Sequence, residues 1–92
     1  MIVRIATEGQ YRIESSYLDH LNSIDNEIVS AIAEGDRKRY AVLFDDLLSL
    51  VRDHGTPVDA DEILESHIVL PPPDTSFEEA QHLFDDQGVI PD

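Results

Sequence analysis

The 92-residue sequence has no cysteine and no tryptophan, and Lys38 is its single lysine. Without cysteine the chain has no disulfide framework, no thiolate zinc site and no cysteine nucleophile. No apolar run approaches the ~20 residues that a membrane-spanning helix needs. The first residues have the pattern of a strand, whereas a secretory leader begins with a basic and then an apolar region. We therefore expect a cytoplasmic protein that does not insert into a membrane.

Basic residues are also scarce, since six of them face twenty acidic residues and the formal charge is −14. Nucleic acids and anionic membrane faces attract clusters of Lys and Arg. The one basic cluster, residues 37–39, lies among acids. Direct binding to nucleic acid or to a membrane is therefore disfavoured. Three explanations of the acidity stay open, in this order: a salt-rich cytosol, a basic partner surface, and mimicry of nucleic acid.

The N-terminal half has the pattern of a β-hairpin followed by two helices. Apolar residues on either side of a polar break at residues 7–9 predict the hairpin. Ser15 and Ser16 offer an N-cap, and Gly35 ends the first helix. Asp36 caps the second helix, which stops at residues 55–57. Only a short link separates the two helices, so they form an antiparallel pair. The apolar stripe of the first helix consists of Tyr17, Leu18, Leu21, Ile24, Ile28, Ala31 and Ile32. The stripe of the second helix consists of Tyr40, Leu43, Phe44, Leu47, Leu48, Leu50 and Val51.

Weaker patterns follow in the C-terminal half. Residues 59–64 have the pattern of a helical turn, and residues 66–70 that of a short strand halted by three prolines. We place this strand beside the hairpin as a third strand, because an isolated hairpin is barely stable. Ser76 and Glu79 form a capping box that opens a last helix, which Gly88 ends. Val89 and Ile90 then fold back onto the core.

These elements predict one domain over residues 1–92 of the α+β class. A small, mostly antiparallel sheet packs on the helical hairpin, and a short C-terminal helix completes the fold. Asn22, Asp25 and Glu27 are expected on the polar side of the first helix.

No arrangement of residues predicts an enzyme or a cofactor site. None of the four histidines (His20, His54, His67 and His82) has a second ligand at the helical spacing of a metal site. The carboxylate pairs Asp45-Asp46, Asp61-Glu62, Glu78-Glu79 and Asp85-Asp86 lie on solvated helix faces or at helix ends, where no cleft shifts their pKa values apart. The sequence has no nucleophile elbow and no phosphate-binding glycine loop. Residues 59–62 offer at most a weak cation site. We expect no catalytic residue, no metal and no cofactor.

The remaining candidates for a functional feature are apolar surfaces that could bind another protein. Leu47 and Leu48 belong to a stripe so wide that it either fills the core on two sides or leaves a part exposed for a partner helix. The core role is favoured. An unpaired strand edge offers a second route, to a homodimer. Residues 71–73 form either a rigid exit from a strand or an extended ligand for an aromatic groove.

Four short stretches together resemble one family. They are the N-terminal block MIVRIATEGQYRI, Gly-Thr-Pro at 55–57, Leu-Pro-Pro at 70–72 and Gly-Val-Ile-Pro at 88–91. The chain resembles the PspAA family of small proteins associated with phage shock protein A, a coiled-coil protein of the envelope stress response. The resemblance covers nearly the whole chain and brings no catalytic residues. The acidity departs from it and indicates a salt-adapted source, such as a halophilic archaeon.

The resemblance implies a non-enzymatic accessory or regulator of a phage shock protein A-like protein, peripheral to the membrane only through that partner. We place the contact at Tyr11, Arg12 and Tyr17, together with an exposed part of the second helix at Leu47 and Leu48. Two alternatives stay open: a winged-helix-like regulator that acts through protein contacts, and an acidic homodimerising domain of another role. A winged-helix protein that reads DNA would need a basic helix, which conflicts with the acidic charge of this chain.

Overall fold

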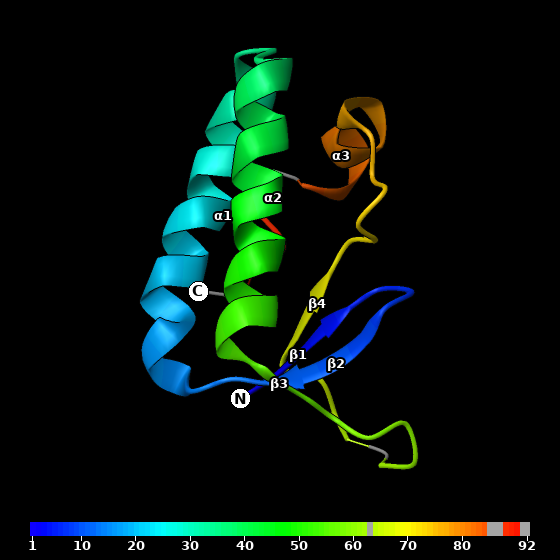
Figure 1. Cartoon of the computed structure of the whole chain (residues 1–92). Helices are drawn as coiled ribbons and strands as arrows, with labels where there is room; N and C mark the ends of the chain where they lie inside the picture. Colours follow the sequence, from blue (N-terminus) through cyan, green and yellow to red (C-terminus); the bar gives the residue numbers. More distant parts are fainter. Residues whose placement is uncertain (63, 85–87, 91–92) are drawn as a thin grey trace.

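The computed structural model describes residues 1–62, 64–84 and 88–90. Two long helices stand side by side in one layer, and a sheet and a short helix lie against them in a second layer (Figure 1). The molecule measures 40 × 25 × 20 Å along its principal axes. This is the α+β architecture that the sequence predicts.

The sheet has four strands in the order β3-β2-β1-β4. β1 (Ile2–Ile5) and β2 (Gly9–Arg12) form the predicted antiparallel hairpin. β4 (Ile68–Leu70) lies beside β1, as expected, but the two strands run parallel, so the sheet is mixed. The strand β3 (Thr56–Pro57) was not predicted, and it pairs antiparallel with β2 at the other edge.

Side chains of the sheet alternate between two faces, as the pleat requires. In the register of β1 and β4, Arg4 pairs with Val69, and both side chains are exposed. Their neighbours on each strand point the opposite way, to the helices, and are buried. These inward residues are Val3, Ile5, Ile68 and Leu70.

The helical hairpin consists of α1 (Leu18–Ala33) and α2 (Arg37–His54). Gly35 ends α1 with φ of 71°, a left-handed conformation that glycine adopts at little cost. Asp36 then caps α2, because its Oδ1 accepts a hydrogen bond from the Arg39 amide at 3.1 Å. The serine cap predicted for α1 is wrong: residues 15–17 form a 3₁₀ turn, and the N-cap position falls on Tyr17, which makes no side-chain cap.

The last helix, α3 (Phe77–Leu83), begins with the predicted capping box, in which the Glu79 amide donates to Ser76 Oγ at 3.1 Å and the Ser76 amide donates to Glu79 at 3.0 Å. The prediction that Gly88 ends this helix is wrong, since α3 ends at Leu83. Residues 59–62 make one hydrogen-bonded turn, from the Glu62 amide to the Asp59 carbonyl, and no helix.

A single apolar core joins the two layers. Tyr40 and Phe44 of α2 stack at a ring-centroid distance of 5.6 Å, and Phe77 and Phe84 meet them edge to face. The Tyr40 hydroxyl donates to the Thr75 carbonyl at 3.0 Å, which anchors the segment before α3. Burial raises the pKa of Tyr40 to about 12. This cluster explains why α3 packs on α2, although it is only seven residues long.

The most unexpected core residue is Asp25 of α1, which is fully buried. We expected it on the polar side of the helix. Instead, its two carboxylate oxygens accept hydrogen bonds from the amides of Val89 and Ile90, at 3.1 and 3.0 Å. Ile90 is itself 2% exposed, so the predicted return of this segment to the core is confirmed. A buried carboxylate of α1 therefore fixes residues 88–90 to the helical hairpin.

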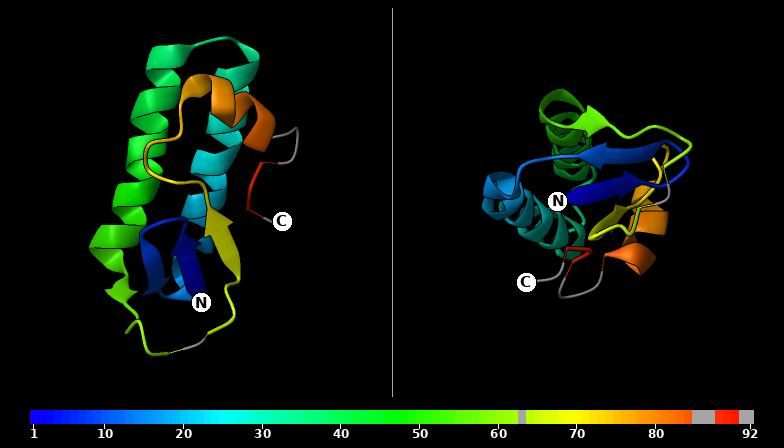
Figure 2. Two further views of the ribbon diagram at one scale, coloured as in Figure 1. Left: turned by 90° about the vertical axis from the view of Figure 1, so that its right-hand side faces the viewer. Right: turned by 90° about the horizontal axis from the view of Figure 1, so that it is seen from below.

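The second layer places several segments on one side of the helical hairpin. The two further views show β4, α3 and residues 88–90 together there, with residues 88–90 near the free side of β4 (Figure 2). Among the described residues, no helix has the length and hydrophobicity required for a membrane span.

Candidate partner-binding surface

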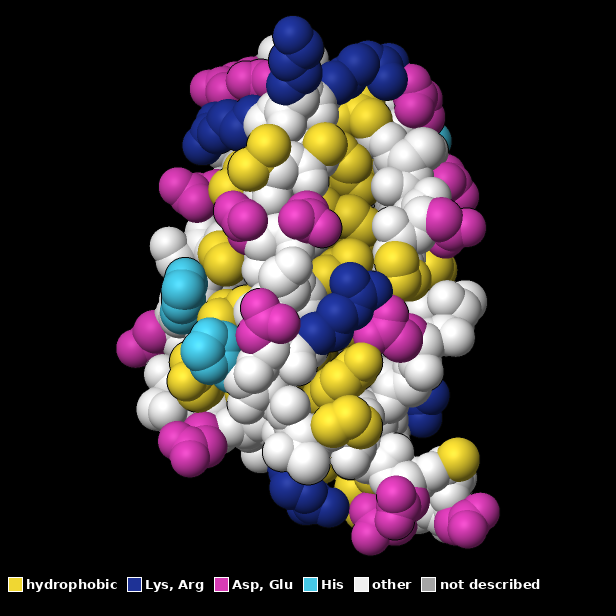
Figure 3. Space-filling view, in the orientation of Figure 1, with side chains coloured by type: hydrophobic (Ala, Val, Ile, Leu, Met, Phe, Trp, Pro, Cys, Tyr) yellow, Lys and Arg dark blue, Asp and Glu magenta, His cyan; other side chains and the backbone are white. Residues whose placement is uncertain are grey.

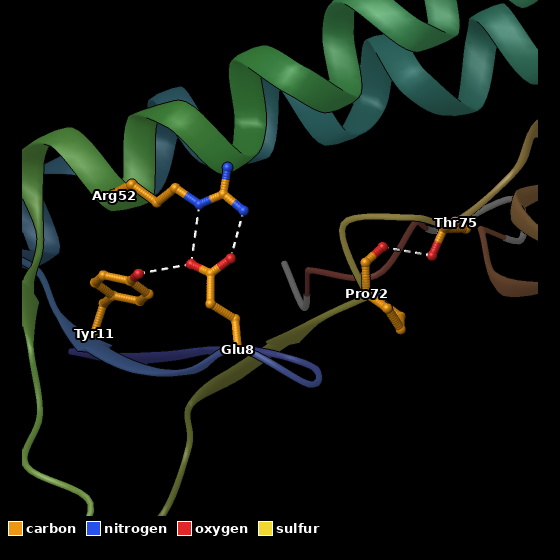
Figure 4. Close-up of polar contacts among 5 residues, drawn as sticks. All are labelled: Glu8, Tyr11, Arg52, Pro72 and Thr75. Carbon is orange, nitrogen blue, oxygen red and sulfur yellow. Dashed lines mark hydrogen bonds and ion pairs between the residues drawn. The ribbon is translucent and has the colours of Figure 1, made fainter.

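The hairpin is tied to α2 by a polar network around Glu8 (Figure 4). Glu8 lies in the turn between β1 and β2, next to Thr7, whose φ of 70° is unusual for a non-glycine residue. Its carboxylate accepts hydrogen bonds from two nitrogens of the Arg52 guanidinium, Nε to Oε2 at 2.9 Å and Nη2 to Oε1, and from the Tyr11 hydroxyl at 2.6 Å. The bidentate geometry is the strong form of this pair.

The hydrogen bonds from Arg52 are the main cause that lowers the pKa of Glu8 from 4.5 to about 2, and the hydroxyl of Tyr11 adds to the effect. The hydrogen bond that the Tyr11 hydroxyl donates to Glu8 raises the pKa of Tyr11, because the bond would be lost if the hydroxyl gave up its proton, and burial adds to the effect. Both partners stay in their ordinary ionisation states at neutral pH. The network is therefore a structural tie, and it supplies no group poised for proton transfer.

Replacing Arg52 by methionine is expected to lower the free energy of unfolding at pH 7 by ~0.5–1 kcal/mol, because the pair is partly solvated. Since the folded pKa of Glu8 is depressed, its stabilising effect is complete above pH 4.5 and declines as the pH falls towards about 2. The difference between wild type and Arg52→Met should shrink over that range in urea titrations at several pH values.

Arg12→Met is the matched control, since Arg12 makes only a 3.5 Å ion pair with Glu62 and both side chains are more than half exposed. It should change stability by ~0.3 kcal/mol or less. Equal losses in the two variants would contradict the special role of the Glu8 network.

The residues predicted for partner contact do not form one surface. Tyr11 faces α2 and is half-buried within the Glu8 network, whereas Arg12 points to the opposite face of the sheet, towards Glu62. Tyr17 is half-buried at the start of α1 and stacks on His54 of α2, at a ring-centroid distance of 4.9 Å. Its hydroxyl lies 3.1 Å from His54 Nδ1. Of the three, Arg12 is the exposed one.

Leu47 and Leu48 belong to the core. Leu47 is fully buried and Leu48 is 3% exposed, and both pack with residues of the sheet and α1. The wide stripe on α2 thus fills the core on two sides, as the favoured interpretation held. A partner cannot touch either side chain in this conformation, so we do not carry them into the proposed interface.

The exposed apolar surface lies elsewhere. Among the described residues, three large apolar side chains are strongly exposed: Val42 at 61%, Val69 at 53% and Leu83 at 48%. Val69 and Leu83 line the same depression, which we call the β4–α3 groove; it has a volume of about 260 Å³ and is completed by Ala6, residues 70–72 and Val89.

A second depression lies at the other end of β4. This β4–α1 groove has a volume of about 380 Å³ and is lined by Met1, Ser15, Leu18, His67 and Ile68. The His67 ring is fixed to β1, because its Nδ1 accepts a hydrogen bond from the Ile2 amide at 2.9 Å. The walls of both grooves are mainly apolar, which suits them to apolar anchors of another molecule.

Charges are distributed unevenly over the surface. Figure 3 shows several Lys and Arg side chains at the end of the helical hairpin, where the α1–α2 turn lies, while Asp and Glu side chains are scattered over the rest of the view. Several of these bases have acidic partners: Arg37 pairs with Glu78, and Arg39 with Glu34. Six bases can neutralise at most six of the twenty acids, so a large acidic excess faces any partner.

The histidines are dispersed. His20 and His82 are exposed, His54 contacts Tyr17, and His67 bonds the backbone of β1. Within residues 1–62, 64–84 and 88–90, no three His, Asp or Glu side chains gather as a metal site would require. The pair Asp85-Asp86 lies outside the described residues.

Comparison with known proteins gives one match. The family model for PspAA, described as PspA-associated protein, covers residues 1–92. No curated protein and no solved structure matches the chain significantly. A match over the whole length, together with a fold that agrees with the predicted elements, assigns the protein: it belongs to the PspAA family of PspA-associated proteins.

Proposed function

We propose that this protein is a non-enzymatic accessory subunit that binds a PspA-like coiled-coil protein and regulates it in the response to envelope stress. The observation that carries the proposal is the full-length match to a family named for its association with PspA. The exposed apolar side chains around β4 and the acidic surface are compatible with it, because a partner needs both an anchor and complementary charge.

In this proposal the protein is cytoplasmic and reaches the membrane only through its partner. A charge of −14 repels an anionic lipid face and attracts basic stretches of a protein. The same acidity would keep the surface hydrated in a salt-rich cytosol, and we propose such a source. A free energy of unfolding that falls steadily as salt rises would contradict that part.

Co-purification tests the proposed function in cells. The chain carries a tag and is isolated from its own organism under crosslinking, and retained proteins are identified by mass spectrometry. A PspA homologue should be the main retained protein, and a tagged PspA homologue should retain this chain in return. If neither direction recovers the other protein above an untagged control, the proposed function is wrong.

A further inference from the structure

We propose that the β4–α3 groove is the docking site for an amphipathic helix of the PspA-like partner, with Lys or Arg beside its apolar stripe. This inference rests on the proposed function and specifies where, and by what chemistry, the partner binds.

Exposed apolar side chains from two different elements converge on the β4–α3 groove. Val69 comes from β4 and Leu83 from α3, yet both line this one groove at 53% and 48% exposure. The only other strongly exposed large apolar residue in the described part of the chain, Val42, lies on α2 and is not part of the groove lining. Single exposed apolar residues are ordinary, whereas convergent ones mark interaction sites.

The second argument is the rigidity of the groove wall. Pro71 and Pro72 form part of it, and proline fixes the backbone. The Pro72 carbonyl accepts a hydrogen bond from the Thr75 hydroxyl at 2.7 Å (Figure 4). It also accepts one from the Thr75 amide at 3.0 Å. A wall ordered before binding costs little conformational entropy when the partner docks.

The third argument concerns the kind of occupant. The groove, at about 260 Å³, is smaller than the ~300–1,000 Å³ of typical small-molecule pockets, and so it suits a few side chains of a protein. Its walls are side chains of a strand, a helix and a proline segment. Strand addition is disfavoured, because β4 has only three residues and prolines follow it at once. An apolar stripe on a helix meets such a groove with side chains alone.

The fourth argument is charge. On the α3 side, exposed Glu79 lies one turn before Leu83 on the same side of the helix, and exposed Asp74 follows Pro72 by two residues. A basic side chain lies on the sheet side instead: Arg4 of β1, which pairs with Val69 of β4 in the strand register. A helix with Lys or Arg beside its apolar stripe complements these exposed acids and the net charge of the chain, whereas a second copy of this chain would bring another charge of −14.

Three serine variants test the proposal: Val69→Ser and Leu83→Ser in the groove, and Val42→Ser as the matched control. Each removes an exposed apolar side chain without changing charge, so each should leave the melting temperature close to that of wild type. Affinity for the purified full-length PspA homologue of the same organism is measured by calorimetry. Each groove variant should weaken binding about tenfold or more, and Val42→Ser should bind like wild type.

A charge variant gives an independent measurement that does not depend on the apolar positions. Asp74→Lys should slow association severalfold, and the difference from wild type should diminish as salt rises.

Other outcomes separate the possible failures. If wild type does not bind the PspA homologue, the proposed function fails and this inference fails with it. If wild type binds and all serine variants bind equally, the function stands and the groove is wrong. If Val42→Ser alone loses binding, the site lies on α2. If the groove variants change only self-association in sedimentation, a second copy is the occupant, and the inference is overturned.

Discussion

Replacing Asp25 by alanine is expected to lower the free energy of unfolding by ~2–4 kcal/mol. The carboxylate is fully buried and accepts the amides of Val89 and Ile90. Removing it leaves two amide donors without this acceptor and a gap beside α1. Urea unfolding measures the loss, and hydrogen exchange at the two amides shows whether residues 88–90 have detached.

Glu27→Ala is the matched control, because Glu27 is exposed on the same helix. It should change stability by ~0.5 kcal/mol or less. Gly88→Ala should destabilise in the same way as Asp25→Ala, since an added Cβ would lie 2.2 Å from Asp25 Oδ2 and the residue has φ of 77°. If Asp25→Ala is neutral or stabilising and the amides stay protected, the carboxylate does not hold this segment.

Replacing Leu47 by alanine is expected to cost ~2–5 kcal/mol of unfolding free energy, because its side chain is fully buried and a cavity would remain. This is a large part of the ~5–15 kcal/mol that stabilises a typical domain. The control is Val42→Ala on the same helix, where 61% exposure limits the expected loss to ~0.5 kcal/mol. A Leu47→Ala variant that unfolds like wild type would show that this position is not in the core.

The sequence was most informative where a local signal determines local structure. The capping box at Ser76 and Glu79, the Asp36 cap and the Gly35 helix end were predicted because each depends on residues within one turn. Strand direction was not predictable in this way. β4 runs parallel to β1 at the edge opposite β3, and side-chain alternation carries no information on strand direction.

Tertiary contacts explain the remaining misses. The second helix stops before Gly55 and Pro57 as predicted, but the strand that follows at once was missed: Pro57 pairs within the edge strand β3, where proline is tolerated. Asp25 could have been found, since it follows Leu21 by four residues and precedes Ile28 by three, within the apolar stripe of α1. A carboxylate in that position indicates a buried hydrogen-bond acceptor, but its partners lie 64 and 65 residues away.

The candidate site was the least predictable part. Val69 and Leu83 meet only because β4 and α3 are folded onto the same side of the helical hairpin (Figure 2). Tyr11 and Arg12 are neighbours in sequence but point to opposite faces of the sheet, as alternation on a strand requires. The sequence indicated that the chain has apolar surface and acidic charge, and the fold determined where the two adjoin.

The most direct test of the central claim is reconstitution of the complex from two purified proteins. This chain and the PspA homologue of its organism are mixed at micromolar concentration in a salt series, and the mass of the mixture is followed by light scattering after gel filtration. The account predicts a complex containing both chains, whose affinity falls as salt screens the acidic surface. If the two proteins elute separately at every salt concentration, while each is folded, the account is contradicted.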